Sequence, residues 1–288
     1  MKNNQFVVTG ASGFVAKSIR KFLSDKNIQV IAISRKNFKK FQNEIKIVSP
    51  NYDEKIILPK IRNANALIHL AGIGKQSVKY NFNQINLEFT KKIINLCLKT
   101  TIQKIVFTSG LGVSRTTPLG YFISKYHAET QIIQSGLNYT IFRPSYIVGK
   151  DDLFTKFLKK QLRRGKILIP GSGQYSIQPI YINDVCKIIF ESILSLKFRN
   201  KVLDLVGPES ITYEEYVKLF SEKTKTKIFK IDLEKAYYNA ISSTNPEFGI
   251  DDLNLLIGDF KGNYKKLQSI SKIKCESIKD LLKTGRLF

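Results

Sequence analysis

The chain has 288 residues, of which 43% are hydrophobic, and its 47 Lys and Arg against 23 Asp and Glu give a net charge of +24. This length and apolar content predict a globular protein with one large domain and a smaller lobe. No stretch reaches the roughly 18 apolar residues that span a bilayer, and the polar start Met1–Gln5 lacks the apolar run of a secretory signal, so we expect a cytoplasmic protein.

The elements of the first half alternate between short apolar strands and amphipathic helices. Strands are predicted at 6–9, 30–33, 66–70, 104–108 and 139–143, and helices at 14–24, 89–98 and 121–135. Continuously apolar strands that alternate with helices indicate a parallel sheet covered on both faces. Right-handed crossovers then give a doubly wound α/β fold, the Rossmann fold.

The second half has a mixed pattern. We predict helices at 154–164, 185–196 and 212–224, strands at 180–182 and 202–205, and a turn-rich segment at 165–173. Thr212 with Glu215 three residues later predicts a capping box. We expect a dinucleotide-binding domain over 1–145 and a C-terminal substrate lobe over 146–288, with about 175–206 returning to the Rossmann sheet; the last 60 or so residues are less periodic.

The segment from Thr9 to Ala16 follows a predicted strand and opens a predicted helix, which is the context that a phosphate-binding turn requires. Gly10 permits the tight turn, Gly13 lets the backbone approach a pyrophosphate, and the small Ala16 takes the place of the third glycine. The alternative is a glycine turn used only for packing. We expect the cofactor to contact Gly10, Ser12, Gly13, Phe14 and Val15.

The end of the second strand carries cations where an acid would select NAD. Ser34 lies where an acidic residue would bind the ribose 2′-hydroxyl, and Arg35 and Lys36 follow it. Arginine binds phosphate in a bidentate way and stacks on aromatic planes. The alternative is that both cations are only solvated. We predict a preference for NADP(H) over NAD(H).

Several further segments, taken in order, resemble those of extended short-chain dehydrogenase/reductases and of NAD(P)-dependent nucleotide-sugar epimerases and dehydratases. The Thr9–Val15 turn is similar to their TGxxGFxG turn. The other matching segments are 67–72 (LIHLAG), 85–90 (INLEFT), 121–125 (YFISK), 142–149 (FRPSYIVG), 178–185 (QPIYINDV) and 205–216. The resemblance covers roughly residues 5–220.

Within this family, the chain most resembles an atypical branch. That branch includes the nucleotide-binding accessory subunit of respiratory complex I and its bacterial and archaeal relatives. The resemblance rests on 108–112 (TSGLG), on the short connection from there to Tyr121, and on the stretches 251–256 and 277–282. It implies cofactor contacts from Leu70, Ala71, Gly72, Asn86, Lys125 and Pro144.

The same resemblance implies that Tyr121 is the general acid/base of a YxxxK pair and that Lys125 lowers its pKa and holds the nicotinamide ribose. Tyr121 and Lys125 are one helical turn apart and share a face. The alternative is a surface Tyr and Lys on an amphipathic helix. Such a pair suits hydride transfer between a carbinol and a carbonyl.

The chain departs from the family pattern at Gly110, which stands where a Ser or Thr usually binds the substrate oxygen. The preceding Ser109 is the candidate substitute, with Asn86 as an assistant. The connection from Gly110 to Tyr121 is also short for a sugar-nucleotide epimerase, which disfavours a nucleotide-sugar substrate.

Three functions follow from these features. The first is an NADP(H)-dependent oxidoreductase or epimerase/dehydratase that acts on a carbonyl or hydroxyl substrate through Tyr121, Lys125 and Ser109. The second is a non-catalytic NADPH-binding accessory, assembly or redox-sensing protein, associated with a protein complex or a membrane surface. The third, a nucleic-acid binder, rests on charge alone; lysines are spread over the chain and no zinc-finger or RRM-like motif is present, so we expect no specific nucleic acid. The oligomeric state stays open.

Other chemistry-bearing residues are few. Cys97, Cys186 and Cys275 lie far apart without CxxC spacing, and His69 and His127 are the only histidines, so we expect free thiols and no metal site. One helix has a cationic face, formed by Lys156, Lys159, Lys160, Arg163 and Arg164, and three further lysines follow later in the chain: Lys223, Lys225 and Lys227. We interpret both groups as solvated surface, and the alternative is that they dock an acidic or phosphorylated partner.

Overall fold

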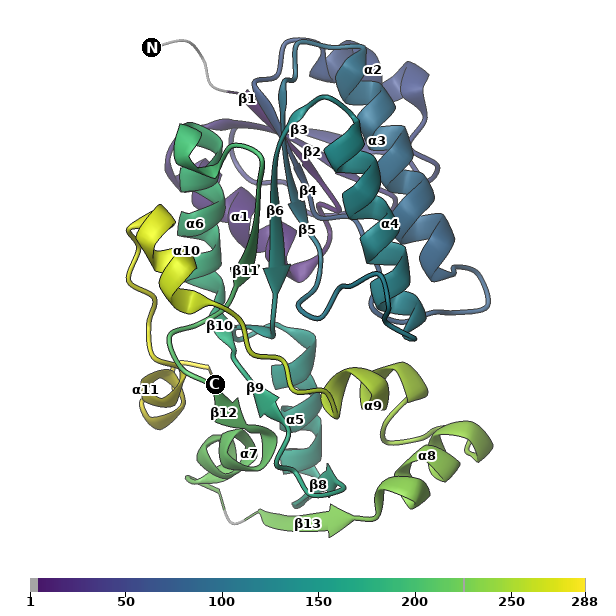
Figure 1. The fold of residues 1–288 in the computed structure, drawn as a ribbon, viewed down its shortest axis with the longest axis vertical. Helices are drawn as coiled ribbons and strands as arrows, with labels where there is room; N and C mark the ends of the chain where they lie inside the picture. Colours follow the sequence, from purple (N-terminus) through teal and green to yellow (C-terminus); the bar gives the residue numbers. More distant parts are fainter. Residues whose placement is uncertain (1–4, 225, 288) are drawn as a thin grey trace.

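A seven-stranded parallel sheet forms the centre of the computed structural model, which describes residues 5–224 and 226–287. The strand order is β11-β6-β5-β4-β1-β2-β3 (Figure 1). The bounds are β1 (Gln5–Thr9), β2 (Gln29–Ser34), β3 (Glu44–Val48), β4 (Ala66–His69), β5 (Lys104–Thr108), β6 (Asn138–Pro144) and β11 (Lys201–Leu205). The predicted doubly wound Rossmann fold is therefore confirmed.

Helices cover both faces of this sheet, as Figure 1 shows. One face carries α1 (Phe14–Asp25), α6 (Ile182–Leu194) and α10 (Tyr264–Ser271), whose buried residues pack with the sheet into one apolar cluster. The other face carries α2 (Glu54–Ile61), α3 (Phe89–Leu98), which follows the π-helical turn η1 (Asn83–Glu88), and α4 (Gly120–Gln134). Because the strand order reverses between β1 and β4, the carboxyl ends of these strands open into the crevice where such folds bind ligands.

A smaller lobe lies beyond the carboxyl ends of the sheet and has its own apolar cluster. Its strands pair two by two: β7 (Ile147–Val148) with β10 (Ile180–Tyr181), β9 (Ser176–Ile177) with β12 (Ile211–Thr212), and β8 (Lys166–Pro170) with β13 (Lys227–Ile231). Its helices are α5 (Leu153–Arg163), α7 (Tyr213–Ser221), α8 (Leu233–Ser242), α9 (Ile250–Leu256) and α11 (Ile278–Lys283). The short η2 (Leu196–Phe198) connects α6 to β11.

Three parts of the lobe differ from the sequence prediction. The segment expected to be turn-rich contains β8, which pairs with a distant strand, β13, so local composition did not signal it. The helix expected at 212–224 ends at Ser221. Two segments named in the sequence analysis, Lys225 and Met1–Asn4, lie outside the described residues. Thr212 does cap α7 by accepting the Glu215 amide at 3.1 Å, but the Glu215 carboxylate pairs with Lys279.

Within residues 5–224 and 226–287, no helix is long and apolar enough to cross a membrane.

Candidate functional site

The glycine turn between β1 and α1 is fixed by its backbone geometry. Gly10 has φ +70°, and a Cβ on it would lie 2.8 Å from the backbone of Leu70 and Ala71 at the end of β4. The Gly13 amide donates to the Gly10 carbonyl at 2.8 Å, and α1 begins at the next residue. Because the helix starts here, its first amides point into the crevice as an anion-binding end.

The other predicted residues of this turn have different partners. The Ser34 hydroxyl donates to the Ser12 hydroxyl at 2.9 Å, which ties the turn to the end of β2. The Phe14 ring lies so close to Gly149 that a Cβ there would be 2.9 Å from it. Val15 is partly buried against the apolar cluster under α1. In this structure, then, Phe14 and Val15 pack the turn against the rest of the molecule, while Ser12 faces the second strand.

Tyr52 is a residue of this turn that the sequence analysis missed. Its hydroxyl accepts the Gly10 amide at 3.2 Å, its ring packs on Phe89, and its backbone has the left-handed φ of 54°. Burial raises the pKa of Tyr52 to about 12, so it stays protonated. No spacing rule marks a tyrosine that reaches the turn from a loop forty residues away in the chain, so its contribution was not predictable.

The end of β2 carries the expected cations. The Arg35 guanidinium lies over the Tyr80 ring at 4.3 Å and near the Phe89 ring at 5.5 Å. Its Nη1 atom is buried and has no hydrogen-bond partner among the described residues. Lys36 is exposed, and its amide donates to the Ser34 hydroxyl at 3.3 Å. A buried cationic donor without a partner among the described residues suits an oxygen-rich anion.

Gly72, Asn86 and Lys125 meet on the opposite side of the crevice. A Cβ on Gly72 would lie 3.0 Å from the Lys125 ammonium and 3.1 Å from the Asn86 amide oxygen. The Lys125 ammonium donates to the Thr108 carbonyl at 3.0 Å. The Asn86 side chain bonds both backbone groups of Ile73, at 2.9 and 3.1 Å. It thereby fixes the chain that leaves β4, and its amide oxygen and the Lys125 ammonium line the space where a Gly72 side chain would stand.

A buried hydrogen-bond chain lies behind these residues. His69 is fully buried between the Thr9 hydroxyl at 2.7 Å and the Thr90 hydroxyl at 2.9 Å. The Thr90 hydroxyl donates to the Asn86 carbonyl at 2.6 Å, so it must accept from His69. Burial lowers the pKa of His69 to about 3, which keeps the ring neutral. His69 therefore connects β1 to the turn that carries Asn86.

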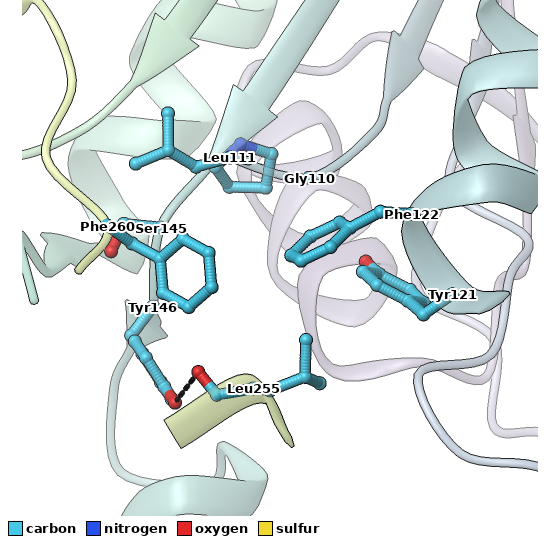
Figure 2. Close-up of a pocket in the computed structure, with 9 residues that line it drawn as sticks. Gly110, Leu111, Tyr121, Phe122, Ser145, Tyr146, Leu255 and Phe260 are labelled. Atoms are coloured by element: carbon cyan, nitrogen blue, oxygen red, sulfur yellow. Dashed lines mark hydrogen bonds between the residues drawn. The ribbon is translucent and has the colours of Figure 1, made fainter. Parts of the chain in front are cut away.

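Tyr121, at the start of α4, lines a cavity of about 140 Å³ between the two lobes. Figure 2 shows its hydroxyl turned toward the space that separates it from the opposite wall. The lining residues are Gly110, Leu111, Tyr121, Phe122, Pro144, Ser145, Tyr146, Leu255 and Phe260. Pro144, which the resemblance assigns to the cofactor, is thus part of this cavity, and Leu255 and Phe260 come from the predicted C-terminal substrate lobe, in which no single site residue was predicted.

Gly110 lies directly beside the Tyr121 hydroxyl. A Cβ on Gly110 would be 3.3 Å from that oxygen and 3.2 Å from the ring. A side chain at this position would therefore lie against the Tyr121 phenol, at the place where the resemblance expects a Ser or Thr. Ser109 is buried, its Oγ has no hydrogen-bond partner among the described residues, and it does not line the cavity. Ser109 and Tyr121 are thus not brought together in this cavity.

Burial sets the protonation of the Tyr121 and Lys125 pair. It raises the pKa of Tyr121 to about 12, so the phenol is a proton donor at neutral pH. Burial also lowers the pKa of Lys125 to about 8, against the opposing effect of the nearby Glu129 carboxylate. Glu129 in turn holds Arg143 through two hydrogen bonds of 2.9 and 2.6 Å. Burial therefore raises the pKa of Tyr121, where the resemblance implied a lowering by Lys125, and the Lys125 ammonium gives up its proton more easily than that of an exposed lysine.

Other residues singled out from the sequence lie apart from this crevice. Cys97, Cys186 and Cys275 are buried thiols. On the cationic helix α5, Lys156 lies 4.0 Å from Asp151 and Arg164 lies 2.6 Å from Glu247. These exposed ion pairs agree with a solvated face.

The crevice fits a dinucleotide with a nicotinamide group in the sense that its parts are open and chemically suited. Gly10 and Gly13 clear the path to the helix end, Gly72 clears the space beside Lys125, and Arg35 presents an unpartnered donor. A diphosphate suits the helix end, a ribose hydroxyl suits the space beside Lys125, and a phosphate suits the Arg35 guanidinium.

Comparisons with known proteins agree with this geometry. The chain is 24% identical, over 226 residues, to the mitochondrial NADH dehydrogenase [ubiquinone] 1 alpha subcomplex subunit 9 of Dictyostelium discoideum. The alignment covers 75% of this chain and 63% of that protein, so the chain spans less than two thirds of this relative.

Solved structures share the fold over nearly the whole chain. MoeE5 in complex with UDP-glucose and NAD superposes with a TM-score of 0.77 at 16% identity, covering 99% of this chain and 97% of that one. UDP-glucose 4-epimerase from Thermotoga maritima with UDP-glucose gives a TM-score of 0.77 at 19% identity, covering 97% and 96%. The sequence profile of the "NAD dependent epimerase/dehydratase family" matches residues 6–198. This match covers more than half of the chain, and the chain therefore belongs to the NAD dependent epimerase/dehydratase family.

Proposed function

We propose that this protein is an NADP(H)-dependent oxidoreductase or epimerase/dehydratase that acts on a carbonyl or hydroxyl substrate. The observation that carries the proposal is the Tyr121 hydroxyl, which lines a cavity at the mouth of the dinucleotide crevice, one helical turn from the buried Lys125. The cytoplasmic location and the small-molecule substrate remain predictions.

Bound nicotinamide supplies or accepts a hydride at the substrate carbon. Tyr121 provides the matching proton: as a phenol it donates to the oxygen of a carbonyl that is being reduced, and as a phenolate it accepts from a carbinol that is being oxidised. Lys125 donates to the Thr108 carbonyl, and its remaining protons are available to a ribose above Gly72. Asn86 fixes the chain after β4 by binding Ile73, and its amide oxygen lies beside the same space.

The preference for NADP(H) is part of the proposal. Its support is the Ser34-Arg35-Lys36 sequence at the end of β2, which lacks an acid, and the buried, unpartnered Nη1 of Arg35 within the described part of the chain. An acid there would favour the ribose 2′-hydroxyl of NAD, whereas a guanidinium suits a 2′-phosphate. The MoeE5 structure named above contains NAD, which does not bear on this preference.

A second candidate function is a non-catalytic cofactor-binding subunit of a protein complex. The observation that favours it is Gly110, which leaves the Tyr121 hydroxyl without a neighbouring Ser or Thr hydroxyl at that position. The similarity to an accessory subunit of an NADH dehydrogenase points the same way. Association with a complex or a membrane surface belongs to this candidate.

Replacing Tyr121 by Phe separates the two candidates. An enzyme that uses this phenol loses roughly 10²–10⁴-fold in turnover, because the substituted ring cannot transfer a proton. NADPH affinity, measured by calorimetry, should stay unchanged and serves as the control for folding. A Tyr121→Phe protein that keeps full turnover of a substrate accepted by the natural chain contradicts the proposed role.

A further inference from the structure

The wall of the cavity that faces Tyr121 comes from the C-terminal lobe and is apolar. Leu255 lies at the end of α9, and its carbonyl accepts the Tyr146 hydroxyl at 3.5 Å. Phe260 follows in the connection to α10, and its ring packs against Phe122 at 5.7 Å between ring centres. Figure 2 shows these side chains across the open space from Tyr121. Leu255 and Phe260 thus give this wall aliphatic and aromatic carbon, beside the hydroxyl groups of Ser145 and Tyr146.

Backbone contacts hold this wall against the rest of the lobe. The Phe260 ring occupies the space over Gly112, where a Cβ would lie 2.7 Å from it. The Phe260 amide donates to the Ser176 carbonyl at 2.9 Å, and the Asp259 carboxylate accepts the Ser176 amide at 2.7 Å. The backbone at Asp259 and Phe260 is therefore held to β9.

The lining contains no charged side chain. Its hydroxyl groups belong to Tyr121, Ser145 and Tyr146; Ser145 accepts the Gln178 amide at 3.2 Å, and Figure 2 shows it beside Phe260, on the side opposite Tyr121. A diphosphate brings charges that are costly to bury without cations. The cavity therefore disfavours nucleotide sugars and accepts an uncharged group.

Volume restricts the substrate further. An apolar cavity of about 150 Å³ holds a molecule the size of benzene, and this cavity measures about 140 Å³. The residues that line the cofactor path, Gly72 and Lys125, are not part of its lining. The space directly next to Tyr121 thus matches about one six-membered ring, while the open side of the cavity leaves the rest of a ligand outside it.

We propose that this cavity binds compact, uncharged carbonyl compounds whose carbonyl carries an apolar group of about one ring. The inference rests on the proposed function, because it assigns the substrate class of the same site. In the reaction, the carbonyl carbon receives a hydride from NADPH and the oxygen receives the Tyr121 proton, which gives an alcohol and NADP⁺.

The first test measures binding by calorimetry to the full chain loaded with NADP⁺. The probes are acetophenone, which carries one ring, 2-acetonaphthone, which carries two, and UDP-glucose. Acetophenone is expected to bind well below millimolar Kd, with 2-acetonaphthone and UDP-glucose each at least about tenfold weaker. Tighter binding of UDP-glucose, or no binding of acetophenone, overturns the inference.

Two substitutions of one wall residue give the second test. Leu255→Trp fills the cavity and should weaken acetophenone binding roughly tenfold or more. Ile250→Trp, on the same helix but outside the lining, is the matched control and should leave binding unchanged. Leu255→Ala enlarges the cavity and should admit 2-acetonaphthone, which keeps the test informative if the tryptophan variant does not fold. Equal affinities in all variants place the ligand elsewhere and overturn the inference.

Turnover distinguishes this inference from the proposed function. The reactive probe 1-phenyl-1,2-propanedione is incubated with NADPH, and loss of NADPH absorbance is followed. Reduction that Leu255→Trp suppresses and Ile250→Trp does not supports both statements. Leu255-dependent binding without reduction supports the cavity assignment and contradicts the enzymatic function. Efficient oxidation or epimerisation of UDP-glucose supports the function and contradicts the substrate class.

Discussion

At the scale of single residues, the most informative position is Lys125. It is 5% exposed, donates to the Thr108 carbonyl and lies against Gly72, in the place where a cofactor ribose would rest. Its ammonium also lies over the Phe107 ring at 4.8 Å. Burial makes its charge costly, the contacts with Thr108 and Phe107 offset only part of that cost, and the pKa is therefore lowered.

The lowered pKa of Lys125 predicts a pH-dependent stability. Its folded pKa of about 8 lies below the ordinary 10.5, so the unfolded chain binds this proton more tightly. The contribution of Lys125 to stability is therefore fully present above a pH of about 10.5, and it is lost as the pH falls through about 8. The free energy of unfolding in urea should rise by roughly 2 kcal/mol across this window relative to Lys125→Met.

Lys160→Met, which removes an exposed lysine, is the control and should follow the pH profile of the natural chain. A natural chain whose profile runs parallel to that of Lys125→Met would show that Lys125 is not the group with the lowered pKa.

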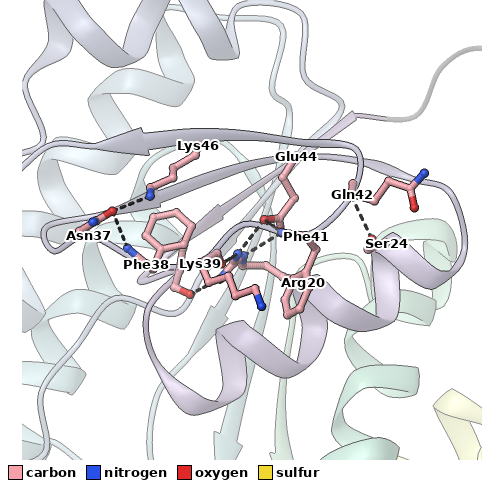
Figure 3. A network of polar contacts seen from close by, with 10 residues as sticks. Arg20, Ser24, Asn37, Phe38, Lys39, Phe41, Gln42, Glu44 and Lys46 are labelled. Atoms are coloured by element: carbon pink, nitrogen blue, oxygen red, sulfur yellow. Dashed lines mark hydrogen bonds and ion pairs between the residues drawn. The ribbon is translucent and has the colours of Figure 1, made fainter.

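At the scale of elements, a buried ion pair holds the first βα unit to the loop after β2 (Figure 3). Arg20 on α1 donates to both oxygens of Glu44 on β3, at 2.8 and 2.7 Å, and both side chains are almost completely buried. It also donates to the carbonyls of Ala11, at 2.6 Å, and Lys39, at 2.9 Å. One guanidinium thus connects the glycine turn, β3 and the 37–43 loop that follows the cations of the cofactor crevice.

Removing one member of this pair should be strongly destabilising. Arg20→Met leaves the Glu44 carboxylate buried without its cation, which typically costs about 3–5 kcal/mol. Urea unfolding measures this cost, and Lys21→Met at the adjacent exposed pair with Asp25 should change stability by less than about 1 kcal/mol. The double variant Arg20→Met with Glu44→Leu should recover part of the loss. Equal effects of Arg20→Met and Lys21→Met would contradict this account of the network.

Local sequence signals predicted some elements and missed others for physical reasons. The glycine turn and the strands β1, β2 and β5 were predictable because continuous apolar runs and glycine spacing are local. β3 was missed because a strand at the sheet edge has only a few buried positions, and α2 because Pro59 inside it reads as a helix breaker.

The same dependence on local sequence signals explains which residues of the candidate site were predicted. Tyr121, Lys125 and Gly110 were found through motif spacing. Tyr52, Leu255 and Phe260 reach the site only through long-range folding. No motif spacing marks them, although Leu255 lies in the stretch 251–256 that carries part of the family resemblance. Residue type and spacing therefore indicated the chemistry, while the shape of the substrate side came from the fold.

At the scale of the whole molecule, the two halves of the site come from different lobes. The sheet supplies the crevice between β1 and β4, and the C-terminal lobe supplies the wall opposite Tyr121. After that wall the chain returns through α10 to pack beside α6 (Figure 1). This return ties the substrate wall to the sheet, so cofactor and substrate positions are set by one continuous packing arrangement.

The central claim is that the crevice binds NADP(H) in preference to NAD(H), and calorimetric titration with NADPH and NADH tests it most directly. We predict NADPH affinity at least about tenfold above NADH affinity in the natural chain. The preference should be lost in Arg35→Ala with little change for NADH, because only the 2′-phosphate contacts that guanidinium. Binding of neither cofactor, or equal affinity for both, would contradict the account.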